Sequence, residues 1–197
     1  MLIRSQNKKN GTTEEELLAG CKRADERIQA RVYELWAPYM KGVCLRYVGY
    51  YDLAEDIMHE GFIKVFLGAK KVEWLGANSF KGWVTRVMVN LCIDHLKKEK
   101  RINKVNIDTA DIGDEDTEKE PTEVFSLQMV EEKGLSKEQL LQMVDSLPET
   151  TRLVFNLYAI EQMSHREIAT TLGIAEEASR TRLKRARIKL KELLENS

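Results

Sequence analysis

The chain has 197 residues, 43% of them hydrophobic and 32% charged, with a formal net charge of −1. This length and composition predict one or two small folded domains rather than one large core. A net charge near zero gives no reason to expect nucleic-acid binding for the chain as a whole, so charge has to be compared segment by segment. The three cysteines are far apart and form no CxxC pair, which argues against a disulfide framework and a zinc ribbon.

Residues 1–12 are a polar tail without the apolar core of a signal peptide. No apolar run approaches the roughly 20 residues that a membrane span needs, so we expect no membrane insertion. The cysteines are expected to be reduced thiols, which suit a cytoplasmic protein. Elsewhere apolar residues recur at helical spacing, without convincing alternation of apolar and polar positions. The predicted fold class is therefore all-α, and residues 13–101 form a first helical domain.

Within this domain, residues 52–66 have the pattern of an amphipathic helix. One face, called the acidic face below, carries four acids and a histidine at helical spacing: Asp52, Glu55, Asp56, His59 and Glu60. A metal site is disfavoured, because His59-Glu60 lacks the second histidine of an HExxH motif. From the residues alone, two interpretations stay open: a solvated acidic surface, or a docking surface for a basic partner.

A loop and a basic helix follow. Residues 71–79 predict a loop that carries Trp74, and either Asn78 or Ser79 is expected to cap a helix over 80–101. Phe80 and Trp83 of this helix are expected in the core. Cations complement the dipole at a helix C-terminus, which explains part of its charge pattern, and contact with DNA would explain more. The basic residues of the helix are Lys81, Arg86, Lys97, Lys98, Lys100 and Arg101.

Residues 102–132 differ in composition from both flanks. Ten acids stand there against Lys104 and Lys119, together with Gly113 and Pro121. Such a composition is typical of a flexible tether. The predicted organisation is two small helical domains joined by a flexible acidic linker, with the second domain over 133–197.

The second domain is predicted to contain a helix that opens at Leu147-Pro148, since proline is tolerated in a first helical turn. Ser164 and Glu167 form a capping box for a short helix, which Gly173 ends. A longer helix begins near Glu176. The residues expected on its buried face are Leu183, Ala186, Leu190 and Leu193.

Positive charge is concentrated over 164–194, where eight basic residues stand against four acids. A short helix, a glycine turn and a basic second helix form the geometry that places a recognition helix in the major groove of duplex DNA. A solvated basic helix packed on its neighbours is the alternative, but turn, caps and charge agree on a helix-turn-helix. Besides Arg166, the basic residues lie on the predicted exposed face of the long helix: Arg180, Arg182, Lys184, Arg185, Arg187, Lys189 and Lys191.

Together these segments resemble a bacterial RNA polymerase sigma factor of the extracytoplasmic function (ECF) group, in the sigma-70 family. The resemblance covers 17–101 and 135–195. Residues 52–66 are similar to the family helix that docks on the polymerase β′ clamp, and 80–101 to the helix that meets the −10 promoter element. Leu147-Pro148 with 164–187 is similar to the domain that binds the −35 element. The three motifs in this order are more specific than any one of them.

The resemblance implies roles for residues of the first domain. The acidic face would contact the polymerase, with Asp56 and Glu60 as the principal contacts. His59 stands where the family usually has glutamine, and its charge can vary with pH. The loop 74–79 would capture an unstacked base of the non-template strand, with Asn78 at the edge of the pocket. The −10 contacts implied are Trp74, Asn78, Lys81, Arg86, Asn90, Lys97, Lys98 and Arg101.

The resemblance also implies roles for the second domain, which would meet the polymerase β flap. Arg180 is expected to read bases, because arginine pairs bidentately with guanine. Glu177-Ala178-Ser179 departs from the glycine-threonine-valine type of opening usual in the family, and a glutamate there would repel phosphate while suiting the helix dipole. The −35 contacts implied are Arg166, Glu176, Glu177, Ser179, Arg180, Arg182, Lys184 and Arg185.

The predicted function is to direct core RNA polymerase to specific promoters and to assist strand opening at the −10 element. No catalytic residue, cofactor or metal is expected, and the protein would associate with the bacterial nucleoid in the cytoplasm. The family implies core polymerase, double-stranded promoter DNA, single-stranded −10 DNA and an anti-sigma protein as partners. An enzyme is disfavoured, because no nucleophile–base pair, P-loop or metal spacing occurs. A stand-alone helix-turn-helix regulator with a helical sensing domain is the alternative, although it needs neither a docking helix nor a −10-like helix.

Overall fold

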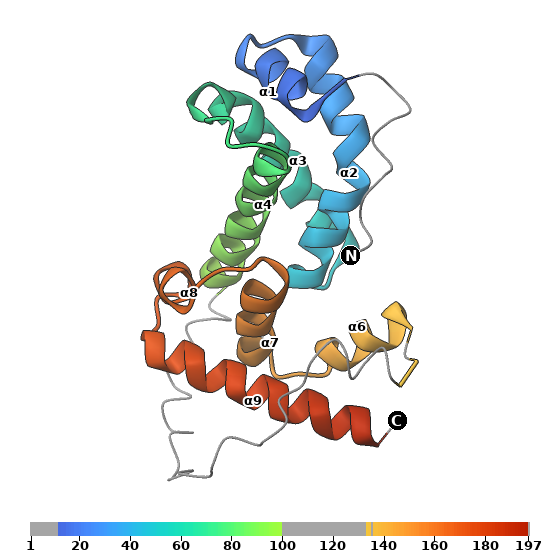
Figure 1. Ribbon diagram of the computed structural model, residues 1–197, viewed down its shortest axis with the longest axis vertical. Helices are drawn as coiled ribbons and strands as arrows, with labels where there is room; N and C mark the ends of the chain where they lie inside the picture. The colour runs from blue at the N-terminus through green and yellow to red at the C-terminus, as the bar shows by residue number, and fades with distance from the viewer. Residues whose placement is uncertain (1–11, 100–132, 135, 197) are drawn as a thin grey trace. The chain divides into compact units, whose positions relative to one another are not determined.

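The computed structural model describes residues 12–99, 133–134 and 136–196. Every regular element in these ranges is a helix, which confirms the predicted all-α class. The chain divides into two compact units, Met1–Lys98 and Glu99–Ser197, each shown in Figure 1 and described by itself. The predicted acidic linker and most of the predicted polar tail lie outside the described residues. Among the described helices, none combines the length and the apolar character needed to cross a membrane.

The N-terminal unit is built from α1 (Glu14–Lys22), α2 (Glu26–Val48), α3 (Tyr51–Gly68), the 3-10 turn η1 (Ala69–Lys71) and α4 (Ser79–Lys98). Helices α2, α3 and α4 pack against one another in pairs, and α1 lies against α2, η1 and α4. Figure 1 shows α1 in dark blue near the end of the unit where α4 begins. The loop that precedes α4 therefore lies close to α1 although some sixty residues separate them in sequence.

Close packing of α3 on α4 depends on Gly61. A Cβ atom at this position would overlap the sulfur of Met88 on α4. Glycine inside a helix costs about 1 kcal/mol relative to alanine, and here that cost allows the two helices to approach. The core that results contains these fully buried side chains among others: Met40, Phe80, Val84, Met88 and Leu96.

Most helix ends of the N-terminal unit are held by local residues. The Thr13 side chain accepts a hydrogen bond from the Glu16 amide, and Glu16 accepts one from the Thr13 amide, in a capping box. Asp25 caps α2 in the same region of the fold. Gly49, with φ of 76°, ends α2 in the left-handed conformation that glycine adopts without strain.

The C-terminal unit contains α6 (Lys137–Asp145), α7 (Glu149–Phe155), a π-helical turn η3 (Asn156–Ile160), α8 (His165–Leu172) and α9 (Glu176–Glu195). The long helix α9 packs on α6, α7 and α8. The core is mostly apolar, and its buried polar residues among those described are Thr151, Asn156 and Ser179. The two side-chain amide atoms of Asn156 make no hydrogen bond within the described residues.

Two details of the predicted C-terminal helices are wrong. Pro148 is the N-cap residue of α7, not a residue of its first turn, and the helix begins at Glu149. Leu194 is buried in α9, whereas Leu193 is half-buried. The helix stays regular to Glu195, so spacings of three and four from Leu183 reach Leu194.

Candidate nucleic-acid interfaces

The acidic face predicted on α3 is present in the structure. Asp52, Asp56, His59 and Glu60 are exposed, and Glu55 is half-buried. Glu55 pairs with Lys41 at 3.0 Å and Glu60 pairs with Lys64 at 2.9 Å. Asp52 and Asp56 form no ion pair with another described residue, so both carboxylates are available to a partner.

Two contacts from α2 stiffen the acidic face. The Nδ1 atom of His59 lies 3.3 Å from the Tyr33 hydroxyl, and the two rings stack with centroids 5.9 Å apart. Lys41 lies over the Tyr51 ring at 3.6 Å. Hydrogen bonding to Tyr51, with a further contribution from Glu55, raises the pKa of Lys41, so this lysine stays charged beside the face.

An apolar continuation of the acidic face was missed from the sequence. Ile63 and Leu67 are 61% and 79% exposed, although both are large and apolar. They lie three and seven residues after Glu60, so they extend the same side of α3 by two further turns. The spacing was visible in the sequence, but apolar residues at helical spacing are read as core.

The loop before α4 has a tight internal geometry. Asn78 is exposed and adopts a left-handed φ of 66°, while Trp74 is half-buried. The Leu75 amide donates to the Ser79 Oγ atom at 3.3 Å, and the Ser79 amide donates to the Gly76 carbonyl at 3.1 Å. Ser79 thus closes the loop on itself.

Asn78, one of the two residues predicted to cap α4, occupies the N-cap position, but its side chain accepts no amide of the first helical turn. The carboxylate of Glu14, on α1, accepts hydrogen bonds from the Asn78 amide at 2.7 Å and from the Lys81 amide at 2.8 Å. Asn78 cannot act as an ordinary cap because its backbone is left-handed, whereas capping residues adopt extended dihedrals. Nothing in the sequence marks Glu14 for this role, since a glutamate in the first turn of α1 is explained by its own helix dipole.

The outer face of α4 carries two of the predicted −10 residues, Arg86 and Asn90, one turn apart. Both are exposed, and the exposed residues Gly82 and Asp94 continue the same side at intervals of four. Lys98 is also exposed, while Lys97 is half-buried. Arg101 lies outside the described residues.

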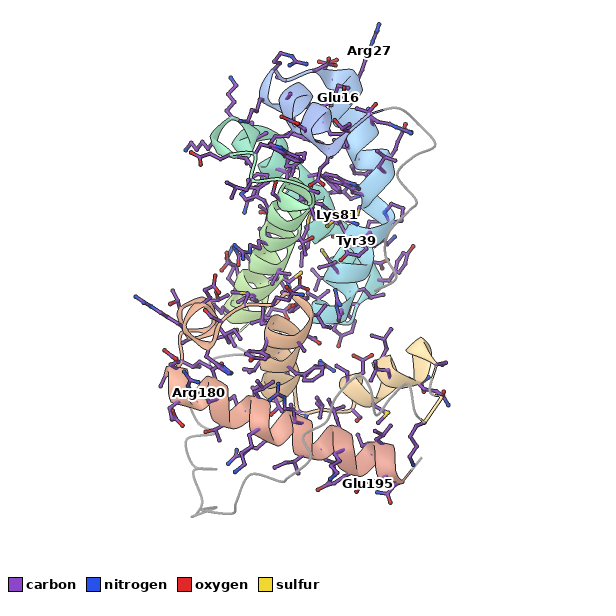
Figure 2. All side chains as sticks on the ribbon, in the orientation of Figure 1. Glu16, Arg27, Tyr39, Lys81, Arg180 and Glu195 are labelled. Atoms are coloured by element: carbon purple, nitrogen blue, oxygen red, sulfur yellow. The ribbon has the colours of Figure 1, made fainter. Side chains whose placement is uncertain are left out.

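Two aromatic clusters position the start of α4. Phe80 is fully buried and meets the Trp36 ring edge-on at 5.2 Å, and Trp83 stacks beside it at 6.1 Å. The Lys81 ammonium lies 4.1 Å from the centre of the Tyr39 ring, and Figure 2 shows these two side chains close together. Lys81 therefore packs on α2, and a phosphate contact would have to draw it off the ring.

The predicted helix-turn-helix is present as α8, a turn at Gly173 and α9. Ser164 and Glu167 form the predicted capping box, and Gly173 adopts a left-handed φ of 73°. Arg166 on α8 is exposed. On α9, Arg182 and Lys184 are half-buried, and the exposed predicted contacts are Glu176, Glu177, Arg180 and Arg185.

The basic surface of α9 is smaller than its sequence suggests. Arg187 lies over the Tyr158 ring at 5.6 Å, inside the unit. Lys189 pairs with Glu192 at 2.9 Å, and Lys191 pairs with Glu195 at 3.7 Å. These pairs offset positive charge in the C-terminal half of the helix.

Arg180, labelled in Figure 2, is exposed. Its guanidinium pairs with the carboxylate of Glu176 one turn earlier in α9. The exposed fractions of the two side chains are 55% and 44%, so solvent screens this pair. A guanine that offers two acceptors can therefore compete with the carboxylate for the guanidinium.

Ser179, predicted as a −35 contact, is not exposed in the structure. Its side chain is fully buried, and its Oγ atom lies 3.0 Å from Nδ1 of His165 on α8. His165 stacks on Tyr158 with centroids 4.7 Å apart. Burial lowers the pKa of His165, and the nearby Arg180 lowers it further. Ser179 and His165 thus join the two helices of the motif, a role that sequence spacing does not reveal.

Comparison with known proteins gives matches over both units. The family described as Sigma-70 region 2 matches residues 32–102, and Sigma-70, region 4, matches residues 137–190. Among the described residues, no group of three His, Cys, Asp or Glu side chains could hold a metal ion.

Relatives with known names support the same grouping. The ECF RNA polymerase sigma factor SigE of Mycolicibacterium smegmatis is 30% identical over 141 residues, which are 72% of this chain and 51% of that protein. The match thus spans about half of that relative's length. The ECF RNA polymerase sigma factor SigW of Bacillus subtilis is 27% identical over 176 residues, covering 88% of this chain and 92% of that one.

A solved structure, the sigma factor RpoE in complex with the anti-sigma factor NepR from Bartonella quintana, is also similar. It is 21% identical with a TM-score of 0.49, covering 84% of this chain and 96% of that one. The two matched sigma-70 regions together span most of the described residues, and named ECF relatives align across both of them. The chain therefore belongs to the sigma-70 family of RNA polymerase sigma factors, in the extracytoplasmic function group.

Proposed function

We propose that this protein directs core RNA polymerase to specific promoters and assists strand opening at the −10 element. The observation that best supports this is the order of three surfaces along one chain. The acidic face of α3, the outer face of α4 and the helix-turn-helix of α8 and α9 follow one another within the two matched sigma-70 regions. A sigma factor needs all three, whereas a DNA-binding repressor needs one.

The acidic face of α3 is the proposed polymerase contact. Asp52 and Asp56 are exposed and without an ion-pair partner among the described residues, so binding to a basic surface would break no salt bridge at these positions. Ile63 and Leu67 would add apolar area at the end of the same face. Apolar area gives affinity at an interface, and charges give register and association rate.

The loop before α4 and the outer face of that helix are the proposed −10 contacts. Extracting one base from a duplex costs a few kcal/mol, so a preformed pocket is needed. The exposed side chain of Asn78 can donate to and accept from a base edge. Arg86, Asn90 and Lys98 would then follow the strand along α4.

The C-terminal unit is the proposed −35 anchor. Helix α9 would lie in the major groove, with its N-terminal half, from Glu176 to Arg185, facing the bases and phosphates. Arg180 would read guanine, and Arg166, Arg182, Lys184 and Arg185 would contact phosphates. Glu176 and Glu177 would restrict the base that fits beside Arg180, since a carboxylate accepts from cytosine N4 and repels phosphate.

A direct test is to mix the full-length protein with core RNA polymerase and measure co-elution on a sizing column. Transcription from promoters selected from the native genome is then measured with the purified complex. We expect co-elution and promoter-dependent initiation. Tight binding to duplex DNA with no binding to core polymerase would instead support a stand-alone regulator.

The acidic face is tested by the double variant Asp52→Asn, Asp56→Asn. The matched control is Glu15→Gln, Glu26→Gln, which removes two exposed carboxylates from the first turns of α1 and α2. The first variant should weaken co-elution with core polymerase and the control should not. Equal co-elution of the two variants with core polymerase would contradict the proposal that the acidic face docks on the polymerase.

A further inference from the structure

The geometry points to Glu14 as a positioning residue for base recognition at the −10 element. Its carboxylate holds the loop before α4 in the conformation that exposes the side chain of Asn78. This inference rests on the proposed function of that loop, and it extends the −10 machinery to a helix that precedes the matched residues 32–102. Glu14 itself need not touch DNA.

The first step concerns the unpaired amides at the start of α4. The Gly82 amide donates to the Asn78 carbonyl at 2.9 Å, which makes Asn78 the N-cap and Lys81 the third residue of the helix. A capping box would satisfy the amides of these two positions with side chains three residues apart. In α4 both amides donate to Glu14, at 2.7 and 2.8 Å. One carboxylate from a distant helix thus replaces both halves of a capping box.

The second step concerns the side chain that this arrangement releases. Thr13, Ser136 and Ser164 cap their helices from extended backbone, and each uses its own oxygen to accept from the third amide. Asn78 has the left-handed φ of 66° instead. Its side-chain amide is exposed and makes no hydrogen bond to another described residue, so both its donor and its acceptor are free for a base.

The third step concerns the rigidity of the support. The capping box of Thr13 and Glu16 fixes the start of α1, and Leu17 and Leu18 anchor the helix in the core. Glu14 is half-buried, whereas the side chain of Glu15 next to it is exposed and forms no hydrogen bond or ion pair with another described residue. The orientation of Glu14 toward α4 is therefore specific to that residue and is not shared by the acidic first turn of α1.

The consequence for recognition follows from preorganisation. A loop already held in its base-binding shape loses less conformational freedom when a base enters it. Without the Glu14 bonds, the loop would have to be ordered by the base itself. The loss would be greatest for the base that Asn78 fits best, so discrimination among bases should fall more than total binding.

The test uses the full-length protein with Glu14→Gln and the matched control Glu15→Gln. Glutamine keeps the size of the side chain but has one acceptor oxygen in place of two. Amide hydrogen exchange should accelerate at Asn78 or Lys81 by about tenfold, the value of one charge-assisted hydrogen bond. Glu15→Gln should leave the exchange rates of both amides unchanged. Unchanged exchange rates in Glu14→Gln as well would contradict the inference.

The functional readout is a ratio of open-complex formation on two promoters that differ only at the unstacked −10 base. Glu14→Gln should lower this ratio several-fold while co-elution with core polymerase stays unchanged. An equal loss on both promoters would show a merely structural role and would overturn the inference. If the unaltered protein fails to bind core polymerase, the proposed function fails, and the exchange measurement still decides whether Glu14 holds the loop.

A double-mutant cycle separates Glu14 from Asn78. Asn78→Gly removes the side chain and keeps the left-handed backbone, which glycine adopts readily. If Glu14 acts through Asn78, adding Glu14→Gln to Asn78→Gly should leave the promoter ratio where Asn78→Gly alone puts it. Additive effects of the two substitutions on the ratio would contradict the inference.

Discussion

Helices α4 and α8 both begin at a proposed DNA-binding element, yet their first turns are stabilised in different ways. Helix α8 is capped by Ser164 and Glu167, which are three residues apart in sequence. Helix α4 is capped by Glu14, which is 64 residues from Asn78 and 67 from Lys81. The cap of α8 is local, whereas the cap of α4 exists only when α1 has docked.

This difference separates two kinds of recognition element. A helix-turn-helix reads a duplex whose shape is already present, so a rigid local motif is sufficient. A loop that binds an extracted base needs an exposed, unpaired side chain, and a local cap would use that side chain. Supplying the cap from α1 resolves the conflict, but it makes the loop depend on the packing of the whole N-terminal unit.

The largest effect is expected for Glu14→Ala. It removes two hydrogen bonds to a charged acceptor and should lower the free energy of unfolding of the N-terminal unit by about 3 kcal/mol. Urea unfolding followed by tryptophan fluorescence measures this unit, because Trp36, Trp74 and Trp83 all lie in Met1–Lys98. Glu15→Ala is the control. An equal loss of unfolding free energy in both variants would show that the carboxylates act on the dipole of α1 and not through hydrogen bonds to α4.

The next effect is expected for Arg180→Ala, on binding and not on folding. Loss of one bidentate contact should weaken binding of the polymerase complex to the preferred −35 sequence by about 1–3 kcal/mol, with little change on sequences altered at that base. Binding is measured by titration of labelled promoter DNA at fixed salt. Equal weakening on every sequence would show that Arg180 contacts phosphate.

Lys98→Ala is the matched control for Arg180→Ala. As a phosphate contact, Lys98 should strengthen binding to all DNA sequences evenly. Its removal should make the slope of log affinity against log salt concentration shallower by about one. A base-specific loss from Lys98→Ala would contradict its proposed place beside the backbone.

A smaller effect is expected for Ser164→Ala. Loss of a local N-cap should lower the free energy of unfolding of the C-terminal unit by about 1 kcal/mol. Circular dichroism in urea measures it, and the tryptophan transition of the N-terminal unit should not move. Ser164→Asp supplies another capping oxygen and should recover most of the loss. Failure of this rescue would show that the Ser164 hydroxyl acts outside the cap.

The structural features predicted correctly from the sequence are those determined by residues a few positions apart. The capping box at Ser164, the turn at Gly173 and the helical spacing of the acidic face all rest on separations of a few positions, and all are present in the structure. Helical spacing also places Arg86 and Asn90 on one side of α4. The fold class and the family follow from many such local patterns taken together.

The predictions that fail depend on contacts between distant elements. Ser179 lies in the first turn of α9, where exposure is usual, but the approach of α8 buries it against His165. In the sequence, Arg187 belongs to the basic residues predicted on the exposed face of α9. In the structure, its guanidinium lies over the ring of Tyr158 in η3. The cap of α4 by Glu14 is the hardest contact to predict. The sequence already explains Glu14 by the dipole of its own helix and Asn78 as a cap residue, so it gives no reason to pair them.

The smallest effect is expected at His165, and it depends on pH. Burial lowers the pKa of this histidine in the folded unit, and Arg180 and Arg187 lower it further, against an opposing effect of Glu176 and Glu177. The unfolded chain therefore takes up the proton more readily than the folded one. The contribution to stability is complete above the ordinary histidine pKa of 6.5 and is lost as the pH falls below it.

His165→Asn tests this linkage, because asparagine can keep a hydrogen bond to Ser179 without titrating near neutral pH. The free energy of unfolding of the C-terminal unit, measured in urea at about pH 5 to 7, should fall with acid in the unaltered protein and less steeply in the variant. His59→Gln, on the exposed face of α3, should leave that slope unchanged. If His165→Asn retains the full slope, the proton is taken up elsewhere, and the His165–Ser179 contact joins α8 to α9 independently of pH in this range.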